Sequence, residues 1–259
     1  LEEARRHVPG CVEVERALER VYELTNDWTA LAALLAARSD RASDAAEKVA
    51  LLLRAATVLV ERGGDATSAL PWIEQARTAR PENLEAALLW ARLQKGAGRT
   101  REALGALEDA ARRTRGKRSP VLATVYLEMG KAYLADDELV EAFDALKAGF
   151  SVDWHCGELA LLLGLVALDM GDDKIAERAL LAVAMAAPRK EGSTAGATAS
   201  EKVTAYIHLA TLAQNQGDLV KARRWAGRAA SEDPSHAGAR ELVAKFDSSR
   251  PMLRKLVNG

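Results

Sequence analysis

The order of a few residues recurs through the second half of this 259-residue chain. One copy consists of Leu163-Gly164, Ala167, Gly171-Asp172, Ala176, Leu180 and Pro188, and the next consists of Leu209-Ala210, Ala213, Gly217-Asp218, Ala222, Ala226 and Pro234. A third copy begins at residue 123, which is 34 residues before the copy that begins at residue 157. A fixed period of this length indicates that one small structural unit is built several times, which constrains the fold more than any other feature.

The pattern within the copies predicts helices. Ala, Leu, Glu and Arg dominate, apolar residues recur at steps of three and four, and alternating runs rich in Val, Ile or Thr are missing. Turn-forming residues interrupt this pattern at intervals, for example GGD at 63–65, MGDD at 170–173 and QGD at 216–218. We therefore expect one helix between successive turns and no β-strand. Ser119 before Pro120 predicts a helix N-cap, and Asp44 with Glu47 predicts a capping box.

The most complete copy is VYLEMGKAYLADDELVEAFDALKAGF, residues 125–150, with Tyr126, Gly130 and Tyr133 ahead of Ala142 and Leu146. It resembles the tetratricopeptide repeat (TPR) family, whose period is 34 residues and whose pattern is W-x2-L-G-x2-Y followed by Ala, Phe and Pro. The resemblance covers nearly all of the chain, although the copies at 51–81 and 85–110 lack the aromatic residue of the first helix. It implies an all-α fold, a right-handed TPR superhelix or α-solenoid.

The resemblance predicts a single solenoid over residues 1–259, with about six helical hairpins and a C-terminal capping helix. The expected hairpins lie at about 11–38, 44–81, 84–114, 119–154, 157–188 and 200–234, with the cap helix at 237–247 and a tail at 248–259. Residues 189–202, RKEGSTAGATASEK, exceed the period and are expected to form a flexible surface loop or an added helical turn before Val203. The opening LEEARRHVPG is typical of the end of a helix, so we expect the C-terminal array of a larger bacterial protein.

Small residues stand at fixed places in the repeat. Ala142, Gly164, Ala176 and Ala222 are expected to be buried at helix crossings, because small side chains let the two helices of a hairpin approach closely. No hairpin of this kind can bury its apolar surface alone. Stability is therefore expected to come from stacking of neighbouring hairpins.

Composition and charge exclude several classes of partner. Lys and Arg number 36 against 37 Asp and Glu, so the chain has no global field that would hold nucleic acid or an anionic membrane surface. The basic stretch 111–119 is compatible with phosphate or RNA, but cations at a helix C-terminus complement the helix dipole, and we interpret it as a solvated run. The longest apolar run, 159–168, is far shorter than the roughly 18 residues of a membrane span. With two cysteines, too few for a disulfide framework, the sequence predicts a cytoplasmic protein without membrane insertion.

The residue patterns of catalysis are missing. His155 and Cys156 are adjacent, but a nucleophile needs its base across a folded site, and the four histidines have no metal-ligand spacing. Acid pairs such as Asp172-Asp173 and Asp136-Asp137 lie at turns, where aspartate is a common capping residue. The sequence contains no phosphate-binding loop and no nucleophile-elbow motif. We therefore expect no enzyme, no cofactor and no metal.

The segment from Leu159 to Leu168 is apolar on every face of the predicted helix. In the TPR family the first helix of each repeat lines a concave groove, and the resemblance implies that Leu159, Leu163 and Val166 serve the stack while other leucines face this groove. The predicted partner-binding residues are Leu127, Lys131, Leu134, Leu161, Leu165, Leu168 and Ile207. A peptide-binding variant of the family clamps a C-terminal carboxylate with lysines and asparagines, whereas leucines and an isoleucine stand at such places here, so chaperone-tail binding is not expected.

These features predict a protein-protein interaction scaffold that binds a partner in an apolar concave groove. The partner would present an amphipathic helix, a peptide or a small-GTPase surface, since Ala- and Arg-rich arrays resemble those of bacterial polarity and motility adaptors, some of which bind a Ras-like GTPase. The alternatives are a regulatory or substrate-docking arm of an enzyme whose catalytic domain lies upstream of residue 1, and a structural spacer. The groove would instead be filled from within if the insert 189–202 covers it, or if Met252, Leu253, Leu256 and Val257 of the tail fold back.

Overall fold

The computed structural model of the chain describes residues 1, 3 and 10–248. The chain forms two compact units, Leu1–Lys117 and Arg118–Gly259. The boundary lies in the exposed connection 115–118. Each unit is a stack of helices and is described by itself.

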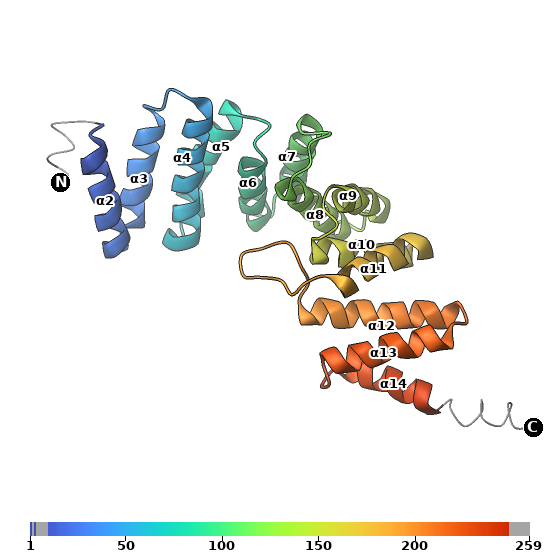
Figure 1. The fold of residues 1–259 in the computed structure, drawn as a ribbon. Coiled ribbons are helices and arrows are strands. Elements are labelled where there is room, and N and C mark those ends of the chain that lie inside the picture. Colours follow the sequence, from blue (N-terminus) through green and yellow to red (C-terminus); the bar gives the residue numbers. More distant parts are fainter. Residues whose placement is uncertain (2, 4–9, 249–259) are drawn as a thin grey trace, which may run out of the picture. The chain divides into compact units, whose positions relative to one another are not determined.

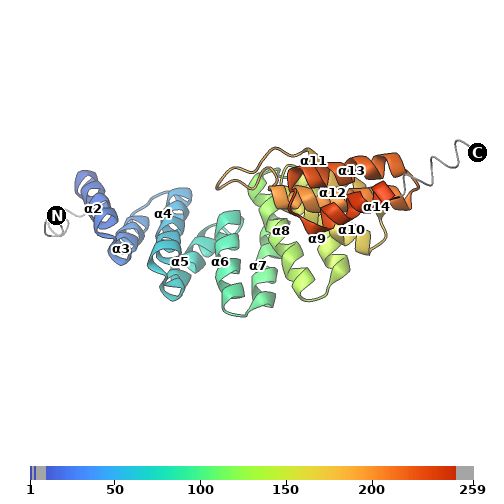
Figure 2. The same ribbon diagram turned by 90° about the horizontal axis from the view of Figure 1, so that it is seen from below.

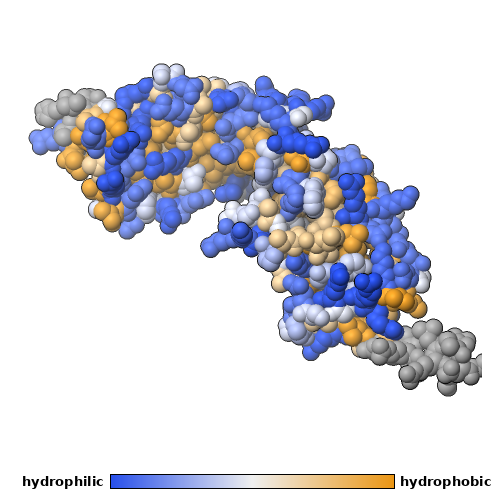
Figure 3. All heavy atoms as spheres, in the orientation of Figure 1, coloured by the Kyte–Doolittle hydropathy of each residue, from blue (hydrophilic) through white to orange (hydrophobic). Residues whose placement is uncertain are grey.

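The first unit is a series of antiparallel helices (Figure 1). These are α2 (Val12–Thr25), α3 (Trp28–Ser39), α4 (Ala45–Val58), α5 (Ala66–Ala79), α6 (Leu84–Gly96) and α7 (Thr100–Arg113), with a π-helical turn, η1 (Leu59–Gly63), extending α4. Fully buried leucines and Ile73 form the core between the helices. Figure 3 shows hydrophobic atoms at the surface of α2, which carries the exposed Val21 and Leu24.

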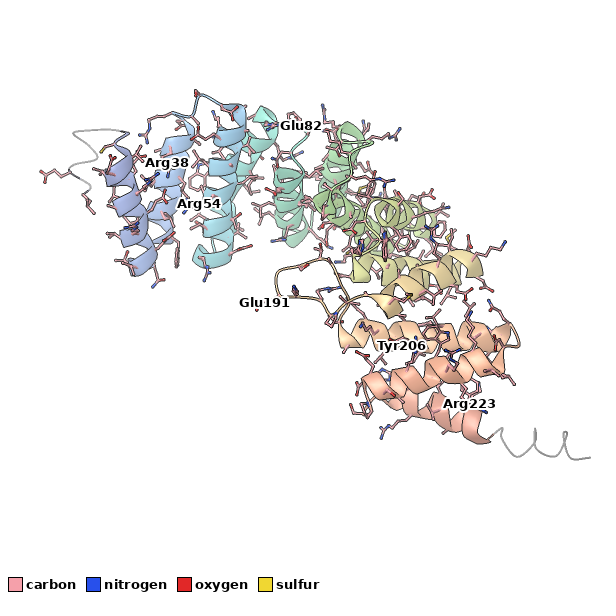
Figure 4. The ribbon with its side chains drawn as sticks, viewed as in Figure 1. Arg38, Arg54, Glu82, Glu191, Tyr206 and Arg223 are labelled. Atoms are coloured by element: carbon pink, nitrogen blue, oxygen red, sulfur yellow. The ribbon has the colours of Figure 1, made fainter. Side chains whose placement is uncertain are left out.

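Ion pairs join the helices on one side of this first unit. Arg38 of α3 and Arg54 of α4, both labelled in Figure 4, contact Glu19 of α2, and Arg38 also reaches the buried Glu15. The basic run at 111–119 begins at the end of α7, as expected from its sequence, because Arg112 and Arg113 lie in the last turn of that helix. Arg113 also pairs with Asp109 at 2.7 Å, one turn earlier.

The second unit continues the same construction. Its helices are α8 (Pro120–Ala135), α9 (Leu139–Val152), α10 (Gly157–Asp169), α11 (Asp173–Met185), α12 (Ala199–Asn215), α13 (Leu219–Glu232) and α14 (Ala237–Ser248). Each helix packs on the next, and the first helices of successive hairpins also touch: α8 contacts α10, α10 contacts α12, and α12 contacts α14. Figures 1 and 2 show these paired helices from two directions. We refer to the side formed by α8, α10 and α12 as the first-helix face.

Helices account for all regular secondary structure in the described residues, apart from the isolated bridges Cys156–Gly196 and Pro188–Ala197. The predicted all-α fold of helical hairpins is therefore confirmed. None of the helices in the described part of the chain combines the length and apolarity needed to cross a membrane.

The Gly-Asp pairs of the repeat build the turn between the two helices of a hairpin. Gly171 and Gly217 adopt left-handed φ angles of 74° and 81°, which glycine tolerates at little cost. The aspartate that follows is the N-cap of the second helix: the Asp172 carboxylate accepts from the Ile175 N–H at 3.1 Å, and that of Asp218 accepts from Lys221 at 2.9 Å. The same type of cap begins α8, where Ser119 accepts from Leu122 at 3.1 Å ahead of Pro120, as predicted.

The small residues lie where the helices cross. Ala142, Ala176 and Ala222 have no exposed surface and Gly164 is buried, as predicted. At Gly130 the fit is close, because a Cβ atom there would stand 2.6 Å from the Leu146 side chain of the opposite helix. The glycine of the repeat therefore sets how closely the two helices of a hairpin can pack.

The insert 189–202 contains both elements that the sequence left as alternatives. Residues 199–202 form the first turn of α12, begun by a complete capping box between Thr198 and Glu201. The preceding loop projects from the ends of α11 and α12 in both Figure 1 and Figure 2. Its base is fixed, because the Arg189 guanidinium donates to both carboxylate oxygens of Glu201 at 2.7 and 2.8 Å, and Ala197 is 1% exposed.

Candidate functional site

Burial divides the leucines of α10 into two sets. Leu159 and Leu163, together with Val166, are buried in one hydrophobic core. Leu161, Leu165 and Leu168 are only half-buried, and they recur at steps of three and four residues along the same helix. Because residues at this spacing share one side of a helix, α10 has one apolar side in the stack and a second apolar side that remains accessible to solvent.

The neighbouring first helices extend this second side. Leu134 of α8 packs partly against the core cluster that contains Leu159 and Leu163. Ile207 of α12 packs partly against the next core cluster, which contains Leu180 and Leu209. Leu168 borders both clusters, which places it at the junction between them. Each of these side chains keeps part of its surface exposed.

Leu127 does not belong to this surface. Its side chain is 3% exposed and lies in the core with Phe143 and Leu146, because both α9 and α10 pack against α8. The expectation that Leu127 lines an open groove is therefore corrected. The remaining predicted residues, which we refer to as the face residues, are Lys131, Leu134, Leu161, Leu165, Leu168 and Ile207.

Lys131 connects α8 to α10 through ion pairs. Its ammonium lies 2.8 Å from a Glu158 oxygen on α10 and 3.0 Å from Glu128 on its own helix. Burial acts to lower the pKa of Lys131, but the hydrogen bonds that its ammonium donates to Glu158 and Glu128 outweigh this effect and raise the pKa above its ordinary value. Lys131 thus stays charged and held between two carboxylates at this end of the face.

A pocket of about 540 Å³ lies at the opposite end of α10, between α10 and α12. We call it the α10–α12 pocket, and its lining residues are Leu165, Leu168, Asp169, Asp173, His208, Thr211, Leu212 and Asn215. Leucines supply its apolar part, and Leu212 among them is 4% exposed. Its volume lies within the range of pockets that hold small ligands or single side chains of a partner.

The polar part of this pocket is acidic. Asp169 is the last residue of α10 and Asp173 the first of α11; both are exposed, and in the described part of the chain neither pairs with a lysine or arginine. Burial lowers the pKa of the His208 imidazole below its ordinary value, and the negative charge of Asp169 offsets this in part. His208 is therefore neutral near pH 7 and adds no positive charge to the pocket.

Sequence reasoning missed most of the pocket's polar residues. The family's groove positions lie along the first helix only, whereas Asp169, Asp173 and Asn215 stand at helix ends. Asp172 and Asp173 were both expected to be turn residues; Asp172 is indeed the N-cap, but its neighbour lines the pocket. The sequence signal that could have indicated this acidic part of the pocket is the presence of Asp169 and Asp173 on either side of the Gly171 turn.

The insert is anchored away from the pocket. The Gly196 N–H donates to the His155 carbonyl at 2.8 Å, and the Gly157 N–H donates to the Gly196 carbonyl at 3.1 Å, so the loop is bound to the beginning of α10. All of 189–202 is described, and none of it lines the α10–α12 pocket. Residues 249–259, which include Met252, Leu253, Leu256 and Val257, lie outside the described residues.

The adjacent side chains of His155 and Cys156 lie in different environments. His155 is exposed, stacks on the Trp154 ring with centroids 3.8 Å apart, and its Nδ1 lies 3.2 Å from Asp153 Oδ1. Cys156 is buried, and burial raises the pKa of its thiol. Within residues 1, 3 and 10–248, no three His, Cys, Asp or Glu side chains gather as metal ligands would.

Comparison with known proteins identifies the fold through structure alone. No protein-family model and no curated protein sequence matches the chain. The C-terminal part of a TPR repeat-containing protein from Cytophaga hutchinsonii superposes with a TM-score of 0.63 at 15% identity, covering 93% of this chain and 91% of that one. PilF of Pseudomonas aeruginosa gives 0.58 at 14% identity, with 90% and 96% covered. YrrB, described as a TPR protein with an unusual peptide-binding site, gives 0.53 at 14% identity, with 74% and 89% covered.

Proposed function

We propose that this chain, which has the tetratricopeptide-repeat fold, is a scaffold that binds a segment of another protein on the first-helix face of its second unit. The observation that carries the proposal is the second apolar side of α10, where Leu161, Leu165 and Leu168 stay half-buried although the stack is already filled by other residues. Exposed apolar surface of this kind, bordered by polar groups, is typical of interaction sites. YrrB, which shares the fold, is described as binding peptide, and this supports a peptide segment as the occupant.

The energy available fits a reversible interaction. Complete burial of one leucine side chain contributes about 1.5–3 kcal/mol, so covering the exposed parts of these three partly buried leucines would contribute about 1–3 kcal/mol. A micromolar complex needs about 8 kcal/mol after the costs of association are met. The leucines therefore supply the apolar centre, and the polar rim and the backbone of the bound segment would have to supply the rest.

Paired substitutions test the proposal. We expect Leu161→Glu combined with Leu165→Lys to abolish capture of a partner from a lysate of the source cells, because both changes place charge in the apolar centre. Val140→Glu is the matched control, since Val140 of α9 is 57% exposed and lies outside the face residues. Circular dichroism should show equal helical content for all variants. Capture that survives in the double variant would contradict the proposal, as would equal loss in the control.

A narrower form of the proposal names the partner as a Ras-like small GTPase and the chain as a bacterial polarity or motility adaptor in the cytoplasm. It rests on the resemblance of Ala- and Arg-rich arrays. Loading the lysate with a non-hydrolysable GTP analogue or with GDP tests it, because such a partner should be captured in one nucleotide state only.

A different role is the docking arm of an enzyme. In that case the captured protein would be a substrate, and it would be chemically altered by the whole protein but not by this chain alone. We propose that this chain acts by binding and supplies no catalytic group, which an activity assay of the isolated chain on the captured partner tests directly.

A further inference from the structure

Resting on the proposed binding site, we infer that the α10–α12 pocket selects a partner segment that carries a lysine or arginine beside an apolar side chain. The pocket combines an apolar part with an unneutralised acidic part, and both parts belong to one cavity of about 540 Å³. A basic amphipathic segment is the occupant that satisfies both.

The helix ends at this pocket also favour a bound cation, independently of the aspartates. Asp169 closes α10 and Asn215 closes α12, so the C-terminal ends of two helices meet in this pocket. The negative end of the helix dipole lies at a helix C-terminus, where cations are stabilising. Neither of these two helices, both fully described, has a basic residue in its last turn. A cation supplied from outside would therefore meet two helix C-termini as well as two carboxylates.

The position of Asp169 strengthens this argument. A carboxylate at a helix C-terminus is unfavourable, because it faces the negative end of the dipole. Asp173, in contrast, lies at the beginning of α11, where the dipole favours its negative charge. A bound ammonium or guanidinium group would therefore offset the unfavourable contact at Asp169.

None of three nearby lysines lines the pocket. Lys131 is held by Glu128 and Glu158 at the other end of α10. Lys245 of α14 donates to Gln214 at 3.3 Å, on the far flank of α12. Lys174, which follows Asp173, is exposed and does not line the pocket.

The expected arrangement follows from these positions. An aliphatic or aromatic side chain would lie against Leu165, Leu168 and Leu212, with the basic group between Asp169 and Asp173. In a helical segment the two side chains would be three or four residues apart. A segment with acidic residues at those places would be repelled, which distinguishes this pocket from a site for C-terminal carboxylates.

Three synthetic peptides test the inference with the whole chain. Each is an amphipathic helix of about 18 residues with the same leucine stripe, and the other positions are all Lys, all Gln or all Glu. We expect fluorescence anisotropy to show about tenfold tighter binding of the Lys peptide than of the Gln peptide, and still weaker binding of the Glu peptide. Asp169→Asn with Asp173→Asn should reduce binding of the Lys peptide to the level of the Gln peptide.

Controls separate a local effect from general charge. Glu141→Gln with Asp144→Asn removes the same two charges from the exposed surface of α9 and should leave the preference intact. If this control abolishes the preference equally, or if all three peptides bind alike, the inference is overturned. If all three peptides bind alike but Leu165→Ser abolishes their binding, the proposed function is still supported. Absence of binding by every peptide at about 1 mM, or binding that ignores Leu165→Ser, would contradict both.

Discussion

Gly164 of α10 and Leu180 of α11 are so close that a Cβ atom on the glycine would stand 2.8 Å from both Cγ and Cδ2 of the leucine. Leu180 is fully buried and cannot move aside freely. We therefore expect Gly164→Ala to destabilise the second unit by about 1–3 kcal/mol, although alanine is the better helix former. Urea unfolding followed by circular dichroism measures this change.

Gly227 of α13 is the matched control. It also lies within a helix, but no atom stands within 4 Å of the place where a Cβ would be added. Gly227→Ala should be neutral or stabilise the protein by about 0.4–1 kcal/mol. Equal effects of the two substitutions would mean that close packing does not determine the glycine of the repeat.

The anchor of the insert gives a second prediction. Both side chains of the Arg189–Glu201 pair are largely buried, so Arg189→Gln should release the loop from the beginning of α10. Hydrogen exchange of the Gly157 and Gly196 amides should accelerate, because their bonds join the loop to the helix. Lys190→Gln, at an exposed neighbouring position, should leave both amides protected. Unchanged exchange in Arg189→Gln would show that the backbone bonds hold the loop without the ion pair.

We expect the stability of the second unit to depend on pH through His208. Its pKa is lowered in the folded state, chiefly by burial, from an ordinary value of 6.5. Below pH 6.5 the unfolded chain therefore binds the proton more readily than the folded chain does. The stabilising contribution is present above that pH and is lost as the pH falls.

Urea unfolding at several pH values checks this sign. Between about pH 7.5 and 5.5, the free energy of unfolding should fall more steeply in the native chain than in His208→Gln, which cannot titrate. Identical slopes would show that His208 is as well solvated in the folded chain as in the unfolded one.

The repeat made the fold predictable because its signals are local. A glycine with a left-handed φ, an aspartate cap directly after it and a small residue at each crossing all act within one hairpin, as Gly171, Asp172 and Ala176 show. The conformation of the insert was harder to predict from the sequence, because Gly196 is fixed by hydrogen bonds to His155 and Gly157, about 40 residues away. No local pattern encodes such a pairing.

The candidate site was predicted in part, for a related physical reason. A rule that assigns groove positions treats every repeat alike, yet Leu127 is enclosed by its own neighbours while Leu161 and Leu165 remain half-exposed. The acidic rim arises where the end of one helix meets the beginning of the next, at Asp169 and Asp173, and only the packing of α10 beside α12 joins it to Leu212.

Site-specific photo-cross-linking tests the central claim most directly. Thr211 is exposed at the rim of the α10–α12 pocket, so a benzophenone amino acid at this position should not disturb the core. We predict that it cross-links to the captured partner, and that the same group at Val140 of α9 does not. Cross-linking from Val140 with none from Thr211 would contradict the claim that the first-helix face is the binding surface.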